Sequence, residues 1–192
     1  MNFGLLSTSP GIPREYWIDA GRFDRVEMEI GPGNCGYLLA AAARAPRTHY
    51  VGIEAQESPL KRVRAARLLP ANLRLIDGDG GWIVRNLLAP RSIDAFHVYF
   101  PDPWWKKRHH KRRIFQPEFC QAARRALTPE GSLFVVSDVV PLFAEIRERM
   151  EEAGFAATPW ERDESDPACG AYESKYRRQG RQFEQARFQF AG

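Results

Sequence analysis

Short apolar runs recur along the chain from residue 26 onward, and most of them are bounded by glycine, proline or an acidic residue. Runs of this length, rich in valine, isoleucine and aromatic residues, are typical of strands that are buried in a sheet. They predict seven strands, at residues 26–30, 48–53, 73–76, 93–100, 132–137, 155–160 and 182–190.

Helix-forming segments separate these strands. They predict helices at residues 37–44, 59–69, 83–88, 117–127 and 142–153. Strands that alternate with helices of this length predict an α/β fold, in which a mostly parallel sheet is covered by helices on both faces. We expect residues 1–24 to form an irregular segment and residues 25–192 to form a single domain.

The composition is typical of a globular protein. The 192 residues are 44% hydrophobic and 27% charged, which is enough for a sizeable core and argues against intrinsic disorder. No apolar run approaches the ~20 residues of a membrane helix, and the first residues do not resemble a signal peptide. The three cysteines form no CxxC pair, and no His, Asp or Glu cluster indicates a metal site. We therefore expect a cytoplasmic protein without a membrane segment, a metal or a disulfide framework.

The net charge of +4 is unevenly distributed. Residues 106–113 read KKRHHKRR and hold six of the 28 Lys and Arg residues, whereas the rest of the chain has 22 basic and 24 acidic residues. Lys and Arg contact phosphates, and the adjacent Trp104 offers a flat face to an unstacked base. The segment therefore predicts an RNA partner, with Lys111, Arg112 and Arg113 as phosphate contacts.

A glycine-rich loop stands between the first predicted strand and the first predicted helix. It carries Gly31, Gly33 and Gly36 in the spacing GxGxxG, in which glycine lets the backbone turn tightly and approach a ligand. Glu54 follows at the end of the next strand, where a carboxylate can accept hydrogen bonds from both ribose hydroxyls. This pattern is typical of sites for NAD and for S-adenosylmethionine.

Glu29 favours the second of these cofactors. Its negative charge, next to the loop, would repel a pyrophosphate but suits the cationic methionine end of S-adenosylmethionine. After the third predicted strand, Asp79 is expected to accept a hydrogen bond from the adenine amino group, with Asp77 as the alternative. An NAD-dependent oxidoreductase is the competing interpretation of these residues.

Residues 101–104 read PDPW and follow the fourth predicted strand. The two prolines restrict the backbone on both sides of Asp102. A fixed carboxylate beside the large aromatic ring of Trp104 is what a flat, hydrogen-bonding base would require. We therefore expect Asp102 to grip a nucleobase.

Several motifs resemble, in order, those of the tRNA (guanine-N7)-methyltransferase family: EIGPGNCG, YVGIE, NLRLIDGD, YFPDPWWKKRHHKRRIF and AYESKY. The resemblance runs from residue 26 to the C-terminus, and PDPW followed by KxRHxKRR is its most specific part. It implies a Rossmann-like class I methyltransferase fold, with a seven-stranded sheet whose last strand is antiparallel. It also implies methyl transfer from S-adenosylmethionine to N7 of a guanine in the variable region of tRNA, at nucleotide 46.

The resemblance also implies roles for individual residues. Cofactor contacts are implied for Glu29, Glu54 and Asp79, and Asp102 resembles the catalytic or substrate-holding acid. Contacts to tRNA or to the guanine are implied for Lys106, Asp138, Tyr172 and Glu173. Two positions depart from the family pattern, because Gly170 replaces a threonine and Cys35 replaces a loop glycine. The alternative is therefore an RNA-binding paralogue that keeps the fold but does not catalyse, or that acts on another substrate.

Overall fold

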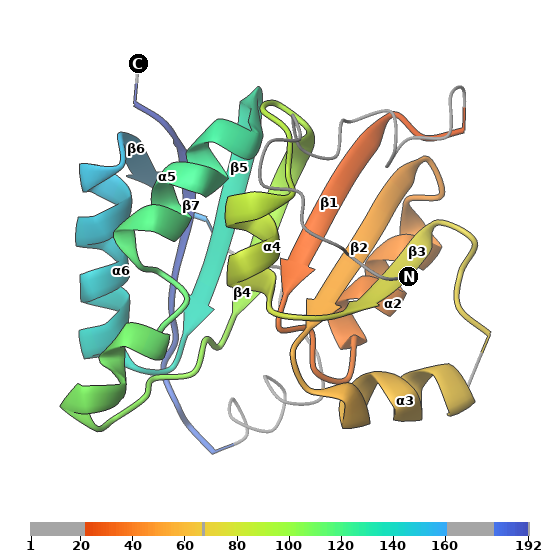
Figure 1. The fold of residues 1–192 in the computed structure, drawn as a ribbon, viewed down its shortest axis with the longest axis horizontal. Helices are drawn as coiled ribbons and strands as arrows, with labels where there is room; N and C mark the ends of the chain where they lie inside the picture. The colour runs from red at the N-terminus through yellow and green to blue at the C-terminus, as the bar shows by residue number, and fades with distance from the viewer. Residues whose placement is uncertain (1–21, 67, 161–178, 192) are drawn as a thin grey trace.

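The computed structural model describes residues 22–66, 68–160 and 179–191. Seven strands form one sheet in the order β3-β2-β1-β4-β5-β7-β6 (Figure 1). They are β1 (Arg25–Ile30), β2 (Thr48–Glu54), β3 (Leu73–Asp77), β4 (Ile93–Tyr99), β5 (Leu127–Ser137), β6 (Phe155–Thr158) and β7 (Glu184–Phe190). Strands β1 to β5 are parallel, and β7 runs antiparallel to both of its neighbours. The predicted sheet, with an antiparallel last strand, is thus confirmed.

Helices cover both faces of the sheet, also as predicted (Figure 1). One face carries α2 (Gly36–Arg44) and α3 (Glu57–Ala66), and the other carries α4 (Gly80–Asn86), α5 (Pro117–Ala126) and α6 (Val140–Glu152). A 3₁₀ helix, η1 (Lys107–Arg112), lies in the connection between β4 and α5.

Each face of the sheet has its own hydrophobic core. The larger core lies under α4, α5 and α6, and Phe96, Phe119 and Ile146 are fully buried in it. The smaller core lies under α2 and α3 and contains Leu38 and Leu60. Burying a side chain of this size stabilises the fold by about 1.5–3 kcal/mol. Because the sheet is packed between the two cores, the strands and their ends are held in fixed positions.

The predicted boundaries differ most at β5 and α4. β5 begins at Leu127 rather than at residue 132, because Ile93 pairs with Leu127 while Ala95 pairs with Ser132. The predicted turn at residues 129–131 is therefore an irregularity within the strand. α4 begins at Gly80 rather than at residue 83, because a side-chain cap starts the helix earlier.

The end of α2 is tied to the sheet by Asn72, which is 6% exposed. Its Nδ2 donates to the carbonyl oxygens of Ala42, Ala45 and Thr48 at 3.0, 3.1 and 2.9 Å. The Ala42 carbonyl would normally accept from the N–H four residues later, but Pro46 stands there and has no N–H. Asn72 therefore supplies the donor that the helix end lacks.

The strand order reverses between β1 and β4, which are neighbours in the sheet. From β1 the chain continues outward to β2 and β3, whereas β4 leads to β5 on the other side. Ligands of open α/β sheets bind in the crevice beyond the carboxyl ends of the strands at such a reversal. A ligand-binding site is therefore expected at the loops that follow β1, β2 and β4.

Candidate functional site

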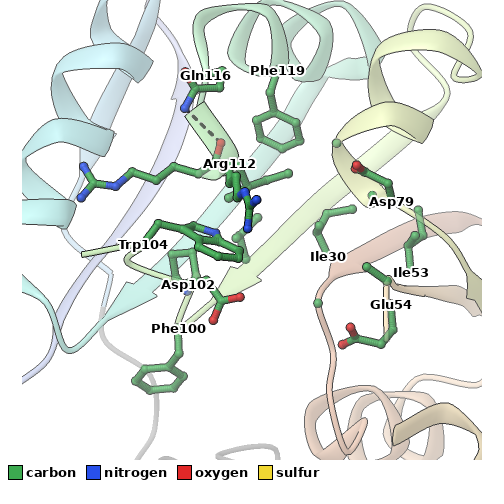
Figure 2. Close-up of a pocket in the computed structure, with 18 of the residues that line it drawn as sticks. Ile30, Ile53, Glu54, Asp79, Phe100, Asp102, Trp104, Arg112, Gln116 and Phe119 are labelled. Carbon is green, nitrogen blue, oxygen red and sulfur yellow. Dashed lines mark hydrogen bonds between the residues drawn. The ribbon is translucent and has the colours of Figure 1, made fainter. Parts of the chain in front are cut away.

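A cavity of about 590 Å³ opens at this reversal. Small-molecule sites fall within about 300–1,000 Å³. Its walls come from the ends of β1, β2 and β4, from α4, from the start of α5, and from the basic loop, by which we mean residues 106–113. Figure 2 shows Ile30, Ile53, Glu54 and Asp79 on one side of the cavity, and Asp102, Trp104 and Arg112 on the other.

The glycine loop forms one edge of the cavity. Gly31 and Gly33 have positive φ angles of 73° and 51°, a conformation that glycine adopts at no steric cost. Gly31 lines the cavity, whereas Gly33 and Gly36 do not. Cys35 also has a positive φ, of 56°, and its side chain is fully buried. This cysteine thus adopts a backbone conformation that a glycine would adopt without strain.

Glu54 is held in the cavity wall by two backbone donors. Its Oε2 accepts from the Gly33 N–H at 3.0 Å, and its Oε1 accepts from the Gln56 N–H at 2.9 Å. These hydrogen bonds fix the orientation of the carboxylate. Each oxygen has a second lone pair, so the carboxylate can accept further hydrogen bonds from a ligand.

Asp79 rather than Asp77 lines the cavity. Its Oδ1 accepts from the Trp82 N–H at 2.9 Å and caps α4, which explains the early start of that helix. Asp77 instead accepts from Arg64 Nη1 at 2.8 Å. The geometry therefore favours Asp79 for a ligand contact and gives Asp77 an ion pair with a neighbouring helix.

Glu29 is 4% exposed and does not line the cavity. Side chains alternate along a strand. Because Val26, Met28 and Ile30 enter the larger core, Glu29 shares the opposite face of the sheet with Glu27. Its assignment as a cofactor contact therefore remains a prediction.

Two non-glycine residues at or directly before the PDPW turn have positive φ. Phe100 precedes it at 52°, and Trp104 ends it at 45°. Such angles cost about 1–2 kcal/mol in residues that have a Cβ atom, and surrounding contacts must hold them. The Phe100 N–H donates to the Val136 carbonyl at 2.8 Å, which extends the pairing of β4 with β5 by one bond. Asp102, inside the turn, is exposed and lines the cavity.

The basic loop borders the same cavity as the glycine loop. Lys111, Arg112 and Arg113 line it. The Arg112 guanidinium lies 5.0 Å from the centre of the Trp104 ring, a cation–π contact. Five of the six cations at 106–113 are exposed, the exception being Arg113. The basic segment and the glycine loop therefore lie at the same edge of the sheet.

Two of the remaining predicted contacts are described by the structure, and neither lines the cavity. Lys106 and Asp138 do not line the cavity, and Asp138 pairs with Arg181 Nη1 at 2.9 Å. Tyr172 and Glu173 lie outside the described residues, as does Gly170. Their roles stay predictions.

Several cavity residues were not predicted from the sequence. Arg85, Ile114, Gln116 and Phe119 line the cavity, because α4 and α5 begin beside it. Arg85 Nε donates to the Gly81 carbonyl at 3.0 Å. No local motif marks Arg85, Gln116 and Phe119, which reach the cavity through the packing of α4 and α5 on the sheet. Ile114 lies in the motif YFPDPWWKKRHHKRRIF, but the motif by itself indicates no role for it.

Within the part of the chain that the structure describes, no group of three His, Cys, Asp or Glu residues could hold a metal ion. No helix among these residues is long and apolar enough to cross a membrane.

A family model described as "Putative methyltransferase" matches residues 24–188. The tRNA (guanine-N(7)-)-methyltransferase of Treponema pallidum (strain Nichols) is 39% identical over 136 residues, which are 69% of this chain and 52% of that protein. The chain thus spans about half the length of that relative. The enzyme of the same name from Myxococcus xanthus (strain DK1622) is 32% identical over 154 residues, 79% of this chain and 75% of that protein.

Solved structures share the fold at lower identity. The aminoglycoside resistance methyltransferase NpmB1 has a TM-score of 0.64 and 19% identity, with 94% of each chain covered. A mutant 16S rRNA (adenine(1408)-N(1))-methyltransferase from Catenulisporales acidiphilia, solved with the cosubstrate SAM, has a TM-score of 0.64 and 16% identity, with 94% of this chain and 92% of that chain covered.

Proposed function

Because the chain belongs to the tRNA (guanine-N7)-methyltransferase family, we propose that it transfers a methyl group from S-adenosylmethionine to N7 of a guanine in tRNA. The target expected from the sequence motifs is nucleotide 46, in the variable region. One observation carries the proposal: a single cavity is lined by Glu54 and Asp79 on one side and by Asp102 and Arg112 of the basic loop on the other, and Gly31 of the glycine loop also lines it. A cytoplasmic location follows from a tRNA substrate.

The cavity fits the cofactor in size and chemistry. Ile30 and Ile53 give it an apolar wall suited to the face of an adenine ring, and both are near the two acids in Figure 2. Glu54 would accept hydrogen bonds from the ribose hydroxyls, and Asp79 would accept one from the adenine amino group. S-adenosylmethionine supplies, when bound, an electrophilic methyl group on a sulfonium centre.

Asp102 would orient the guanine. Guanine N7 has a lone pair and no proton, so the reaction requires no base at that atom. The Asp102 carboxylate would accept hydrogen bonds from the N–H edge of the base and offset the positive charge that develops on the purine. Alignment of the two reactants can supply up to about 7–11 kcal/mol of the barrier reduction.

The basic loop would hold the tRNA. Lys111 and Arg112 are exposed at the cavity edge and would contact phosphates. Moving a guanine out of its stacked position in the tRNA costs a few kcal/mol of stacking free energy. Stacking of the base on the Trp104 ring would offset part of this cost. This assignment separates tRNA binding from methyl transfer, because different side chains carry them.

The test is incubation of the full chain with labelled S-adenosylmethionine and tRNA transcripts, followed by nucleoside analysis. We expect 7-methylguanosine, and we expect a guanine-to-adenine change at nucleotide 46 to abolish it. Asp102→Ala should reduce transfer at least 100-fold while the Kd for tRNA stays within about twofold. Asp24→Asn is the control, because Asp24 is exposed, pairs with Arg47 and lies outside the cavity lining.

Two results would reject the proposal. Methylation of another base would show a different specificity. Cofactor and tRNA binding without transfer would support the RNA-binding paralogue instead.

A further inference from the structure

We infer that Arg113 and Glu145 form a clamp that positions Asp102, and that Arg113 is not a phosphate contact. The inference rests on the proposed function, since it assigns these two residues to the geometry of the proposed active site. Arg113 belongs to the basic run by sequence, but its surroundings differ from those of the other five cations.

The Arg113 guanidinium is occupied by contacts within the protein. Its side chain is 11% exposed. Nε donates to the Pro103 carbonyl at 2.9 Å, and Nη2 donates to His110 Nε2 at 2.9 Å. Nη1 forms an ion pair with Glu145 Oε2. The guanidinium is thus already paired with a carboxylate, and three of the five N–H donors are already used.

Glu145 connects this arginine to the helical layer. It lies in α6, and its Oε1 also pairs with Arg149 Nη2 at 2.6 Å. Arg149 Nη1 in turn donates to the Phe115 carbonyl. One glutamate therefore ties two points of the connection between β4 and α5, at Pro103 and at Phe115, to the same helix.

The start of α5 adds a further tie. Gln116 Nε2 donates to the His110 carbonyl at 3.0 Å and to the Arg113 carbonyl at 3.1 Å. These bonds hold the C-terminal half of the basic loop against the helix. Arg113 thus extends from a fixed backbone.

These contacts bear directly on Asp102. On its N-terminal side, Phe100 is fixed to β5 by its N–H. On its C-terminal side, Pro103 is fixed by Arg113. Between these anchors the φ angles of Pro101 and Pro103 are restricted by their rings, so few rotations remain for the segment. Loss of the Arg113 contact would release one anchor and let the carboxylate move relative to the cavity.

The first test uses steady-state kinetics and binding. Arg113→Gln and Glu145→Gln should each lower kcat by about 10–100-fold, since a displacement of about 1 Å has effects of this size. The Kd for tRNA should stay within about twofold, and the slope of log Kd against log salt should not change. The matched control is Lys111→Gln, which should lower that slope by about 0.7–0.9.

A double-mutant cycle tests whether the two residues act together. Arg113→Gln combined with Glu145→Gln should lower kcat no more than the stronger single variant does. Multiplicative losses, or an unchanged kcat in the Glu145→Gln variant, would overturn the clamp. A salt slope lowered by Arg113→Gln as much as by Lys111→Gln would return Arg113 to the phosphate contacts.

A second measurement does not depend on methyl transfer. Trypsin cleaves after Lys and Arg, and the loop offers five exposed sites at 106–108 and 111–112. Both Gln variants should be cut there at least five times faster than the wild type, while Lys111→Gln should keep the wild-type rate at the remaining sites. If the wild type transfers no methyl group but this pattern holds, only the proposed function fails; unchanged cleavage rejects the clamp by itself.

Discussion

Replacing Asn72 by alanine should destabilise the fold strongly, although Asn72 is not part of the site. The hydrogen bonds from Nδ2 to the Ala42 and Thr48 carbonyls are buried. The bond to Ala45 is partly exposed, and that carbonyl also accepts from the Thr48 N–H at 3.0 Å. The substitution therefore leaves two buried acceptors without a donor.

The magnitude follows from these two groups. A buried acceptor without a partner costs about 1–3 kcal/mol, which gives about 2–6 kcal/mol for the pair. Water that enters from the side of Ala45 reduces this cost, so we expect the free energy of unfolding to fall by about 2–4 kcal/mol. Asn72→Asp should cost more, because a carboxylate would face three carbonyl oxygens.

The assay is urea unfolding at 25 °C, with the free energy extrapolated to water. The matched control is Asn86→Ala, since Asn86 Nδ2 donates to the Trp82 carbonyl at 2.7 Å on the exposed side of α4. That change should cost less than about 1 kcal/mol. If the two alanine variants unfold with the same free energy, the account of the α2 end is wrong.

Three further predictions concern the buried faces of the sheet. Burial would raise the pKa of Glu27, but the hydrogen bond and charge of His97 lower it below its ordinary value. The ionised Glu27 side chain should therefore stabilise the fold fully at neutral pH and lose this effect as the pH falls through its pKa in the folded protein. Glu27→Gln should thus lower the free energy of unfolding more at pH 7 than at pH 3. An equal decrease at both pH values, measured by urea unfolding, would refute this. Burial raises the pKa of Cys120 to about 12, so at pH 8 the Cys120 thiol should be alkylated only as fast as the protein unfolds. Mass spectrometry of the peptide that contains Cys120 measures this rate, and alkylation at the rate of a free thiol would contradict the prediction. Gly52→Ala would place a Cβ atom 2.5 Å from Leu38 Cδ1, so it should lower the free energy of unfolding in urea by about 1–3 kcal/mol. An unchanged free energy of unfolding would contradict this.

Local patterns were enough to predict the sheet and the edge of it at which the cavity lies. The central strands β2 and β4 are buried along nearly their whole length, because the sheet is covered on both faces, and their mostly apolar sequences are visible without knowledge of tertiary contacts. Gly31, Glu54, Asp79 and Asp102 follow strands, so the general position of ligands in α/β folds was sufficient to bring them together.

Contacts between distant residues could not be predicted in this way. Arg113 lies in a run of cations and is separated from Glu145 by 32 positions, so its ion pair depends on how α6 packs. His97 meets Glu27 across 70 positions, at 3.0 Å. The start of α4 is different, because DGDGG contains the capping residue Asp79, so a local signal for a helix that begins before residue 83 is present in the sequence.

The backbone at Phe100 and Trp104 has a consequence for protein engineering. Both residues keep a left-handed conformation that stores about 1–2 kcal/mol each, and glycine would release it. Selection for heat resistance alone therefore favours relaxation of these two positions, whereas selection for turnover favours the shape that they impose. A library built on this chain should be scored for both properties at once.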